Sequence, residues 1–196
     1  NSRWIAFYQD PKPIAYNTNR VSGAEAPKNW EDLAQPRWKG RLGIPVADGP
    51  EWVNVILKIM GQDKGTEHLK RMAAQDIRME KSNSGLAQLV AAGDLDLAFF
   101  VNNAAVEIAK GQGAPIAAVA TDPLVTSPQV LIVFKDAPRP FAAALLLDWL
   151  TSKEGQERVR DINPRFSARK DVAFPPSFAG RKFLVIGAEQ VSKARM

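Results

Sequence analysis

The side chains best suited to acid–base chemistry are His68, Asp94 and Asp96. General acid–base catalysis most often uses histidine, but His68 lies in the run TEHLK at 66–70, which predicts a charged, solvated helix face. Asp94 and Asp96 could form a carboxylate pair, yet they follow Gly93 at an expected helix-to-strand turn, where aspartate is favoured. No nucleophile with an activating base beside it is apparent. The sequence therefore predicts a protein that is not an enzyme.

Other chemistry-bearing motifs are missing from the sequence. The chain contains no cysteine, which excludes disulfides, thiolate nucleophiles and zinc–cysteine sites. It has no glycine-rich phosphate loop of the Walker or dinucleotide type. Its uncharged runs, such as 123–134 and 140–147, are shorter than the about 20 apolar residues of a membrane helix. We therefore expect no cofactor, no metal ion and no membrane-spanning helix.

Two adjacent amides, Asn102 and Asn103, stand where a predicted strand at 95–101 meets a predicted helix at 102–111. Ligands of open α/β sheets collect beyond the carboxyl ends of the strands, and amide groups can both donate and accept hydrogen bonds. The pair is therefore a candidate ligand site. Capping of the helix by either asparagine is the alternative, and both roles are compatible.

Short apolar runs alternate with amphipathic stretches at helical spacing, which indicates an α/β protein with helices packed on a sheet. Asp48 with Glu51, and Thr151 with Glu154, have the spacing of capping boxes and predict two helix starts. Gly61 predicts a helix end. Strands are expected at 14–16, 42–46, 95–101, 115–120 and 130–134, and helices at 48–60, 65–75, 84–92, 102–111, 142–150 and from 151 onward.

The net charge of +5 raises the question of nucleic-acid binding. The surplus of basic residues lies in 158–196, where Arg158, Arg165 and Lys170 stand among acidic residues and prolines. Nucleic-acid binders usually gather basic and aromatic residues on one face. The sequence therefore favours a solvated or partner-facing surface over a nucleic-acid site.

Seven segments form an ordered set along the chain. They are PIAYNT at 13–18, NWEDL at 29–33, PRWKGRLGIP at 36–45, KSNS at 81–84, AAGD at 91–94, DWLTSKEGQ at 148–156 and RKDV at 169–172. In their order and spacing, which cover nearly the whole chain, they resemble the family of extracellular solute-binding proteins related to bacterial ferric-iron-binding proteins.

The resemblance implies an α/β chain with the periplasmic-binding-protein type II fold, mostly the second lobe plus part of the first. Such proteins close two α/β lobes around a ligand. Complete members are longer, so the resemblance implies a fragment that lacks most of the first lobe and exposes apolar surface. The expected division is 1–20 as a crossover or first-lobe segment, 21–125 as the second lobe, 126–162 as a first-lobe segment and 163–196 as a tail returning to the second lobe.

The resemblance further implies the ligand-binding component of an ABC-type importer, which binds a small solute in the cleft between the lobes. The expected partners are the solute and the permease subunits of the transporter. No nucleic acid is expected, and contact with the membrane is expected only through the permease. The implied location is the periplasm; no signal-peptide pattern begins at Asn1.

Iron-binding members of the family hold ferric ion partly through two adjacent tyrosines, just after a strand and an Asn-rich turn. The matching positions here are Ala104 and Ala105. Ferric ion prefers anionic oxygen donors, which alanine lacks. The resemblance therefore implies a ligand other than bare ferric ion: a small organic anion or zwitterion, a phosphonate-like molecule, or a metal chelate bound as a whole.

Five further residues, in three segments, match the cleft of the family. Asn83 and Ser84 match a position that faces the cleft, with helix capping as the alternative. Asp48 and Gly49 match a turn that offers N–H groups to an anion, but the carboxylate of Asp48 opposes an anion and suits a ligand bearing an amine. Lys12 falls where relatives present a cation to the ligand, and a plain surface lysine is the alternative.

Two other functions compete with solute delivery. The same fold serves as the ligand-sensing domain of receptors and regulators, and sequence flanking the chain would separate this function from transport. A hydrolase on an α/β scaffold is the third alternative, and the lack of a nucleophile–base pair argues against it.

Overall fold

The chain folds around two β-sheets. The computed structural model describes residues 4–162, 165–174, 178 and 180–187. The larger sheet has five strands, in the order β4 (Arg78–Glu80), β3 (Leu42–Pro45), β5 (Leu97–Phe99), β2 (Ile14–Asn17) and β6 (Ile116–Val119). Strand β3 is parallel to both β4 and β5, whereas β2 is antiparallel to both β5 and β6. The α/β architecture predicted from the sequence is confirmed.

The central strands of this sheet are buried on both faces. Ile14, Leu97 and Phe99 lie in one hydrophobic cluster, and the intervening Ala15 and Ala98 lie in another. This alternation follows from the two-residue period of a strand. Because both faces are apolar, each needs a layer of helices to cover it.

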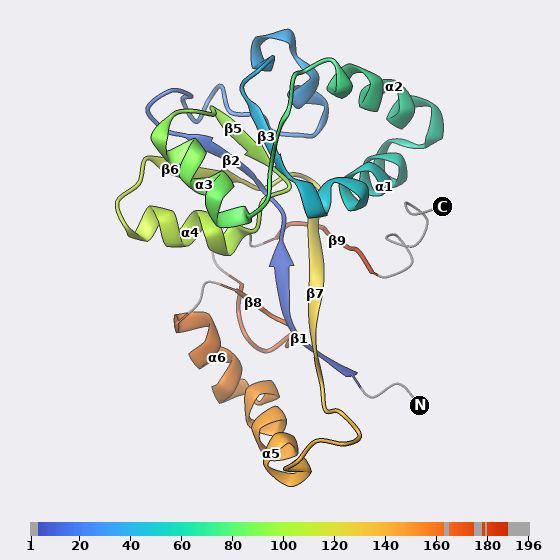
Figure 1. Cartoon of the computed structure of the whole chain (residues 1–196), viewed down its shortest axis with the longest axis vertical. Coiled ribbons are helices and arrows are strands. Elements are labelled where there is room, and N and C mark those ends of the chain that lie inside the picture. The colour runs from blue at the N-terminus through green and yellow to red at the C-terminus, as the bar shows by residue number, and fades with distance from the viewer. Residues whose placement is uncertain (1–3, 163–164, 175–177, 179, 188–196) are drawn as a thin grey trace.

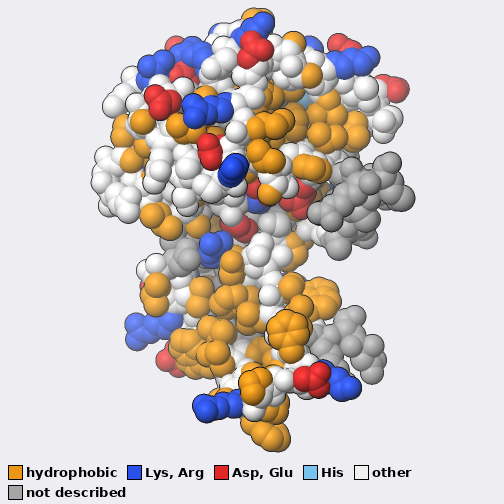
Figure 2. All heavy atoms as spheres, in the orientation of Figure 1, with side chains coloured by type: hydrophobic (Ala, Val, Ile, Leu, Met, Phe, Trp, Pro, Cys, Tyr) orange, Lys and Arg blue, Asp and Glu red, His pale blue; other side chains and the backbone are white. Residues whose placement is uncertain are grey.

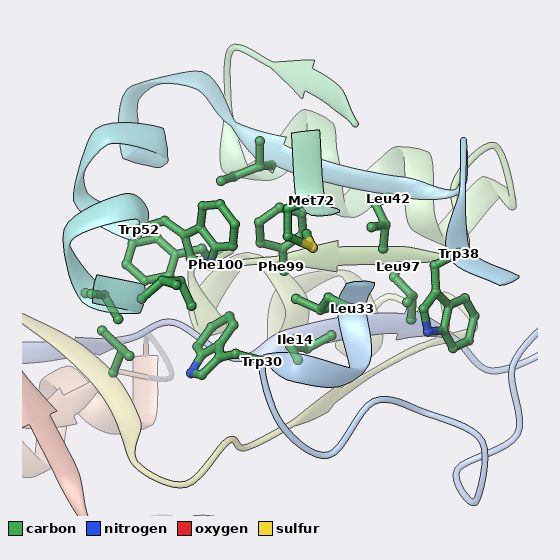
Figure 3. Packing of buried hydrophobic residues seen from close by; sticks show 14 of the residues in the cluster. Ile14, Trp30, Leu33, Trp38, Leu42, Trp52, Met72, Leu97, Phe99 and Phe100 are labelled. Atoms are coloured by element: carbon green, nitrogen blue, oxygen red, sulfur yellow. The ribbon is translucent and has the colours of Figure 1, made fainter. Parts of the chain in front are cut away.

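Four helices supply those layers (Figure 1). The cluster around Phe99 also contains Trp52 and Met72, and Figure 3 shows these side chains gathered with Trp30 and Leu33. The opposite cluster contains apolar residues of the two other helices. The four are α1 (Gly49–Met60) and α2 (Gln62–Ala73) on the first face, and α3 (Asn83–Ala92) and α4 (Asn103–Gly111) on the second.

Two glycines shape this part of the chain. A Cβ atom at Gly43 would lie 2.6 Å from methyl carbons of both Leu86 and Leu95, so glycine is what lets α3 pack closely on β3. Gly61, the predicted end of the first helix, ends α1 with a φ of 79°, a conformation that favours glycine.

The smaller sheet lies beside the larger one and continues away from it (Figure 1). Its two longest strands were predicted poorly from the sequence: no strand was expected at 4–11, and only 130–134 was expected of the second. Its strands, in order, are β8 (Phe166–Ser167), β1 (Trp4–Pro11), β7 (Leu124–Ile132) and β9 (Phe183–Val185), with α5 (Pro140–Thr151) and α6 (Lys153–Ile162) following β7.

The segment after α6 adds β8 and β9 to the smaller sheet and packs one buried residue, Ile186, into the core of the larger sheet. Strand β9 pairs in parallel with β7, and Ile186 is buried in the same cluster as Phe99 and Trp52. Residues 163–164, 175–177, 179 and 188–196 of the predicted tail at 163–196 lie outside the described residues.

Helix α5 carries the apolar stripe expected at 142–150, but the stripe is exposed. Phe141, Leu145, Leu146 and Trp149 are 89%, 72%, 57% and 43% exposed, and α5 has no buried residue. Figure 2 shows apolar side chains gathered over this part of the molecule. No helix among the described residues is long and apolar enough to cross a membrane.

The capping box predicted at Thr151 and Glu154 is wrong. The Thr151 hydroxyl donates to the carbonyl of Leu147 (2.9 Å) within α5. The Ser152 hydroxyl instead accepts from the N–H of Gly155 (3.1 Å). Ser152, which lies between the two helices, therefore caps the start of α6.

The solvated position predicted for His68 is also wrong. His68 is fully buried, its ring lies 6.3 Å from that of Trp52, and neither ring nitrogen has a hydrogen-bond partner among the described residues. Helix α2 places His68 and Met72, which are four residues apart, on the face that packs against the core. Burial lowers the pKa of His68, Arg71 lowers it further, and Glu31 acts in the opposite direction.

Asp96 is buried too, unlike its exposed neighbour Asp94. Its carboxylate accepts from Arg20 and pairs with Arg41. A carboxylate removed from water needs such partners. Asp96 therefore connects the segment after β2, through Arg20, with the segment before β3, through Arg41. It is more than a turn residue.

The burial of His68 predicts a loss of stability in mild acid. Since its folded-state pKa lies below the usual value of 6.5, the unfolded chain takes up a proton that the folded chain does not as the pH falls below that value. We expect the free energy of unfolding, measured in urea, to fall between about pH 7.5 and about pH 5.5. The His68→Leu variant should lose less over that range, and an equal loss in both proteins would contradict the assignment.

Asp96→Ala should destabilise the fold by about 2 kcal/mol, which urea unfolding would measure. Loss of one partner of a buried ion pair costs about 3–5 kcal/mol, but the side chains of Arg20 and Arg41 are 50% and 42% exposed and can return to water. Asp94→Ala is the matched control and should change stability by no more than about 0.5 kcal/mol. Equal effects of the two substitutions would refute the role of Asp96.

Candidate functional site

A cavity of about 720 Å³ lies between the edge of the larger sheet and strands β1 and β7. Most of its polar side chains come from segments far apart in the sequence. It is lined by Trp4, Tyr8, Asp10, Lys12, Asp48, Glu51, Asn83, Asn102, Ser127, Pro128, Gln129, Val130, Ile132, Arg165, Ile186 and Gly187.

The topology of the larger sheet explains why polar residues meet at this edge. Strands β3, β4 and β5 run in parallel, and each is followed by a helix: α1, α3 and α4. The three helices therefore begin at the same edge of the sheet. Asp48 immediately precedes α1, Asn83 begins α3, and Asn102 immediately precedes α4.

Lys12 lies at the centre of the polar wall. Its side chain is only 5% exposed, and its ammonium group donates to Asp48 Oδ2 (3.2 Å) and to Asn102 Oδ1. The same group lies 5.8 Å from the centre of the Phe100 ring, within the range of a cation–π contact. A buried ammonium requires this kind of compensation, so Lys12 is not a plain surface lysine.

Asn83 and Asn102 contact each other directly. The backbone N–H of Asn102 donates to Asn83 Oδ1 (2.7 Å). Neither side chain caps its helix: Ser82 accepts from the N–H of Gly85 at the start of α3 (3.0 Å), and Asn102 makes no side-chain cap bond at α4. Both amides are therefore committed to the cavity wall, not to helix capping.

The link from β5 to α4 passes through an unusual backbone conformation. Phe100 has a φ of 58°, in the left-handed region that non-glycine residues seldom adopt. Such a conformation costs on the order of 1–3 kcal/mol and persists where the surroundings enforce it. Phe100 is fully buried beside Trp30, with ring centres 6.1 Å apart. This turn brings Asn102 to the ammonium group of Lys12.

The capping box predicted at Asp48 and Glu51 is wrong. A 3₁₀ turn, η3 (Val46–Asp48), leads directly into α1, and the N–H of Gly49 bonds to the carbonyl of Val46. Asp48 makes no side-chain cap bond. Its carboxylate pairs with Lys12 instead.

The structure brings four of the predicted site residues to the cavity: Lys12, Asp48, Asn83 and Asn102. The other three are not among its lining residues. Ser84 is exposed on α3, and Gly49 begins α1. Asn103 is buried in the first turn of α4, and its Oδ1 atom has no hydrogen-bond partner among the described residues.

The sequence patterns missed a second charged group on the opposite wall. Asp10, at the end of β1, is 3% exposed and lies 3.6 Å from Arg165. Arg165 also covers the ring of Tyr8 at 4.6 Å. Burial raises the pKa of Asp10, although Lys12 and Arg165 act in the opposite direction. No local pattern links positions 10 and 165, so only the folded chain brings them together.

Ala104 and Ala105 lie in the first turn of α4 and supply no oxygen donor from their side chains. Within the described ranges, no group of three or more His, Cys, Asp or Glu residues is placed to hold a metal ion.

The fold and the polar cavity define a solute-binding protein with the type II periplasmic-binding fold. Residues 1–194 match the family model described as bacterial extracellular solute-binding protein, and the chain belongs to this family. The family and its structural neighbours are binding proteins rather than enzymes.

Known proteins agree with this assignment. The chain is 33% identical over 98 residues to the Fe(3+)-binding periplasmic protein of Serratia marcescens, a match that covers 49% of this chain and 29% of that protein. Iron-bound HitA from Pseudomonas aeruginosa has a TM-score of 0.75 at 23% identity, over 90% of this chain and 60% of HitA. An ABC-transporter substrate-binding protein from Agrobacterium tumefaciens has a TM-score of 0.79 at 13% identity, over 98% of this chain and 65% of its own.

The contact between Lys12 and Asp48 predicts a measurable coupling energy. Lys12→Met should destabilise the protein by about 3 kcal/mol, because it leaves the half-buried Asp48 without a counter-ion. A double-mutant cycle with Asp48→Asn should give a coupling of about 1–3 kcal/mol in chemical unfolding.

The exposed pair of Lys39 and Asp76, 3.6 Å apart with side chains 61% and 69% exposed, is the control for this cycle. It should show a coupling below about 1 kcal/mol. A coupling between Lys12 and Asp48 no larger than that of the control would contradict the structural importance of the buried ammonium group.

Proposed function

We propose that this chain forms the cleft of a solute receptor that delivers a small molecule to an ABC-type importer. The observation that carries the proposal is the polar cavity of about 720 Å³ between the two sheets. A volume of this size suits a small organic molecule. Its walls hold charged and amide groups that can bind a solute, and the described lining residues include no histidine and no nucleophile paired with an activating base.

The proposed receptor has two lobes. The larger sheet, with α1–α4, is the second lobe at 21–125, to which β2 is added from the 1–20 crossover. Residues 126–162, with α5 and α6, contribute to the first lobe, and 163–196 returns to the second. The pairing of β9 with β7 and the burial of Ile186 in the larger core support that return.

The exposed apolar side chains of the smaller part support a first lobe that is completed by other segments of the whole protein. Besides those on α5, Ile132 and Phe134 are 55% and 78% exposed. The solved relatives named above extend beyond the matched region, since the chain covers 60% and 65% of their lengths. Apolar surface of this extent is normally covered in a folded protein.

The proposed ligand is not bare ferric ion held by a tyrosine pair. Ala104 and Ala105 stand at the positions that the family resemblance assigns to the two phenolates, and neither side chain can donate an oxygen. A small organic solute or a metal chelate bound as a whole fits the amide-rich wall better.

The proposed partners are the permease subunits of the importer, and the proposed location is the periplasm. The Serratia marcescens relative is named as a periplasmic protein, and the Agrobacterium tumefaciens neighbour as part of an ABC transporter. A ligand-sensing domain with the same fold would bind its solute in the same cleft. Co-purification with permease subunits distinguishes transport from sensing.

Blocking the cavity should abolish solute binding. In a thermal-shift screen of small organic solutes and metal chelates, a ligand at 100 times its Kd should stabilise the protein by about 2.7 kcal/mol. Ser127 lines the cavity from β7, and the indole ring of Ser127→Trp should obstruct the cavity and remove the shift.

Ser84→Trp is the matched control, because Ser84 is exposed and does not line the cavity. It should keep the full thermal shift. The proposed function fails if no solute stabilises the protein, or if Ser127→Trp leaves the stabilisation unchanged.

A further inference from the structure

The charged groups of the cavity do not balance. Two cations, Lys12 and Arg165, face three carboxylates, those of Asp10, Asp48 and Glu51. Lys12 pairs with Asp48 at 3.2 Å, and Arg165 pairs with Asp10 at 3.6 Å. Glu51 forms no ion pair with any of the described residues. Among the described residues, one negative charge in the cavity wall is therefore left without an ion-pair partner.

The environment of Glu51 makes that charge costly. Glu51 is partly buried in the first turn of α1, three residues after Asp48. Burial raises the pKa of its carboxyl group, Lys12 acts in the opposite direction, and Asp48 raises it further. The pKa of Asp10 on the facing wall is raised by burial as well. Both carboxyl groups would gain from additional positive charge in the space between them.

The nature of the missing cation follows from the rest of the wall. Within the described part of the chain the carboxylates are not grouped closely enough to hold a metal ion, and the cavity is far larger than an ion. Trp4, 58% exposed on the facing wall, offers an aromatic face to an organic cation. An anion would meet two cations that are already paired, and an unpaired carboxylate that repels it.

We propose that the solute carries a protonated amine and that the carboxylate of Glu51 is its counter-ion in the cavity, an inference that rests on the proposed solute-binding function. The ammonium group binds next to Glu51, at the start of α1. The amide nitrogens of Asn83 and Asn102, whose oxygens already accept hydrogen bonds, and the amide group of Gln129 then remain for the other polar groups of the solute.

The test compares matched pairs of solutes that differ in one amine. Isothermal titration of the whole protein would use 4-aminobutanoate against butanoate, 2-aminoethyl phosphate against ethyl phosphate, and 1,4-diaminobutane against 1,4-butanediol. At least one amine should bind, and its partner without the amine should bind about tenfold to a hundredfold more weakly, as expected for a charged hydrogen bond.

Glu51→Gln should remove that preference, because it keeps the shape of the side chain and removes its charge. Glu67→Gln, at an exposed position on α2 outside the cavity, is the control and should keep the preference. The proposal is overturned if amine and non-amine partners bind equally, if Glu51→Gln keeps the preference, or if no member of the pairs binds. If a solute without an amine binds and Ser127→Trp abolishes that binding, this inference alone is overturned and the proposed function stands.

Discussion

An ammonium group almost without solvent contact lies where the chain crosses from one sheet to the other. The backbone N–H of Lys12 donates to the carbonyl oxygen of Val125 on β7 (2.9 Å). This bond joins the connection between β1 and β2 to the start of β7. Its side chain reaches Asp48 and Asn102, at the starts of two helices of the larger sheet. Because a buried cation is stable only with such partners, one residue ties the crossover to the wall of the cavity and fixes its position.

The two walls of the cavity have different origins. One is built from residues at the starts of helices that follow parallel strands, an arrangement that collects polar groups at one edge of a sheet. The other is built from β1 and β7, the two longest strands of the smaller sheet. His68 takes no part, since it is buried against Trp52 in the core. The site therefore has the means to bind a solute from two sides, and its described lining residues do not include His68.

Local patterns predicted four of the five strands of the larger sheet, missing β4, and predicted the smaller sheet poorly. The strand at 42–46 and the helix stops at Gly61 and Gly93 follow from neighbouring residues, and the structure confirms them. The strand at 4–11 and the early part of β7 were missed, because their pairing joins residues more than a hundred positions apart. His68 was misplaced because its charged neighbours lie on the other face of the helix, whereas its own ring points inward.

The candidate site was also hard to predict where its contacts join residues far apart in the sequence. Lys12 has nothing in its local sequence that indicates burial, since its partners Asp48 and Asn102 lie 36 and 90 positions away. Asp10 and Arg165, which were not predicted as site residues from the sequence, meet only in the fold.

The proposed receptor closes its two walls on a solute, and a distance measured across the cavity tests this central claim most directly. Since the chain has no cysteine, spin labels can be placed at the exposed positions of Lys58→Cys and Asp136→Cys. Double electron–electron resonance should show a shorter distance between the labels when a stabilising solute is bound, and an unchanged distance distribution would contradict the account.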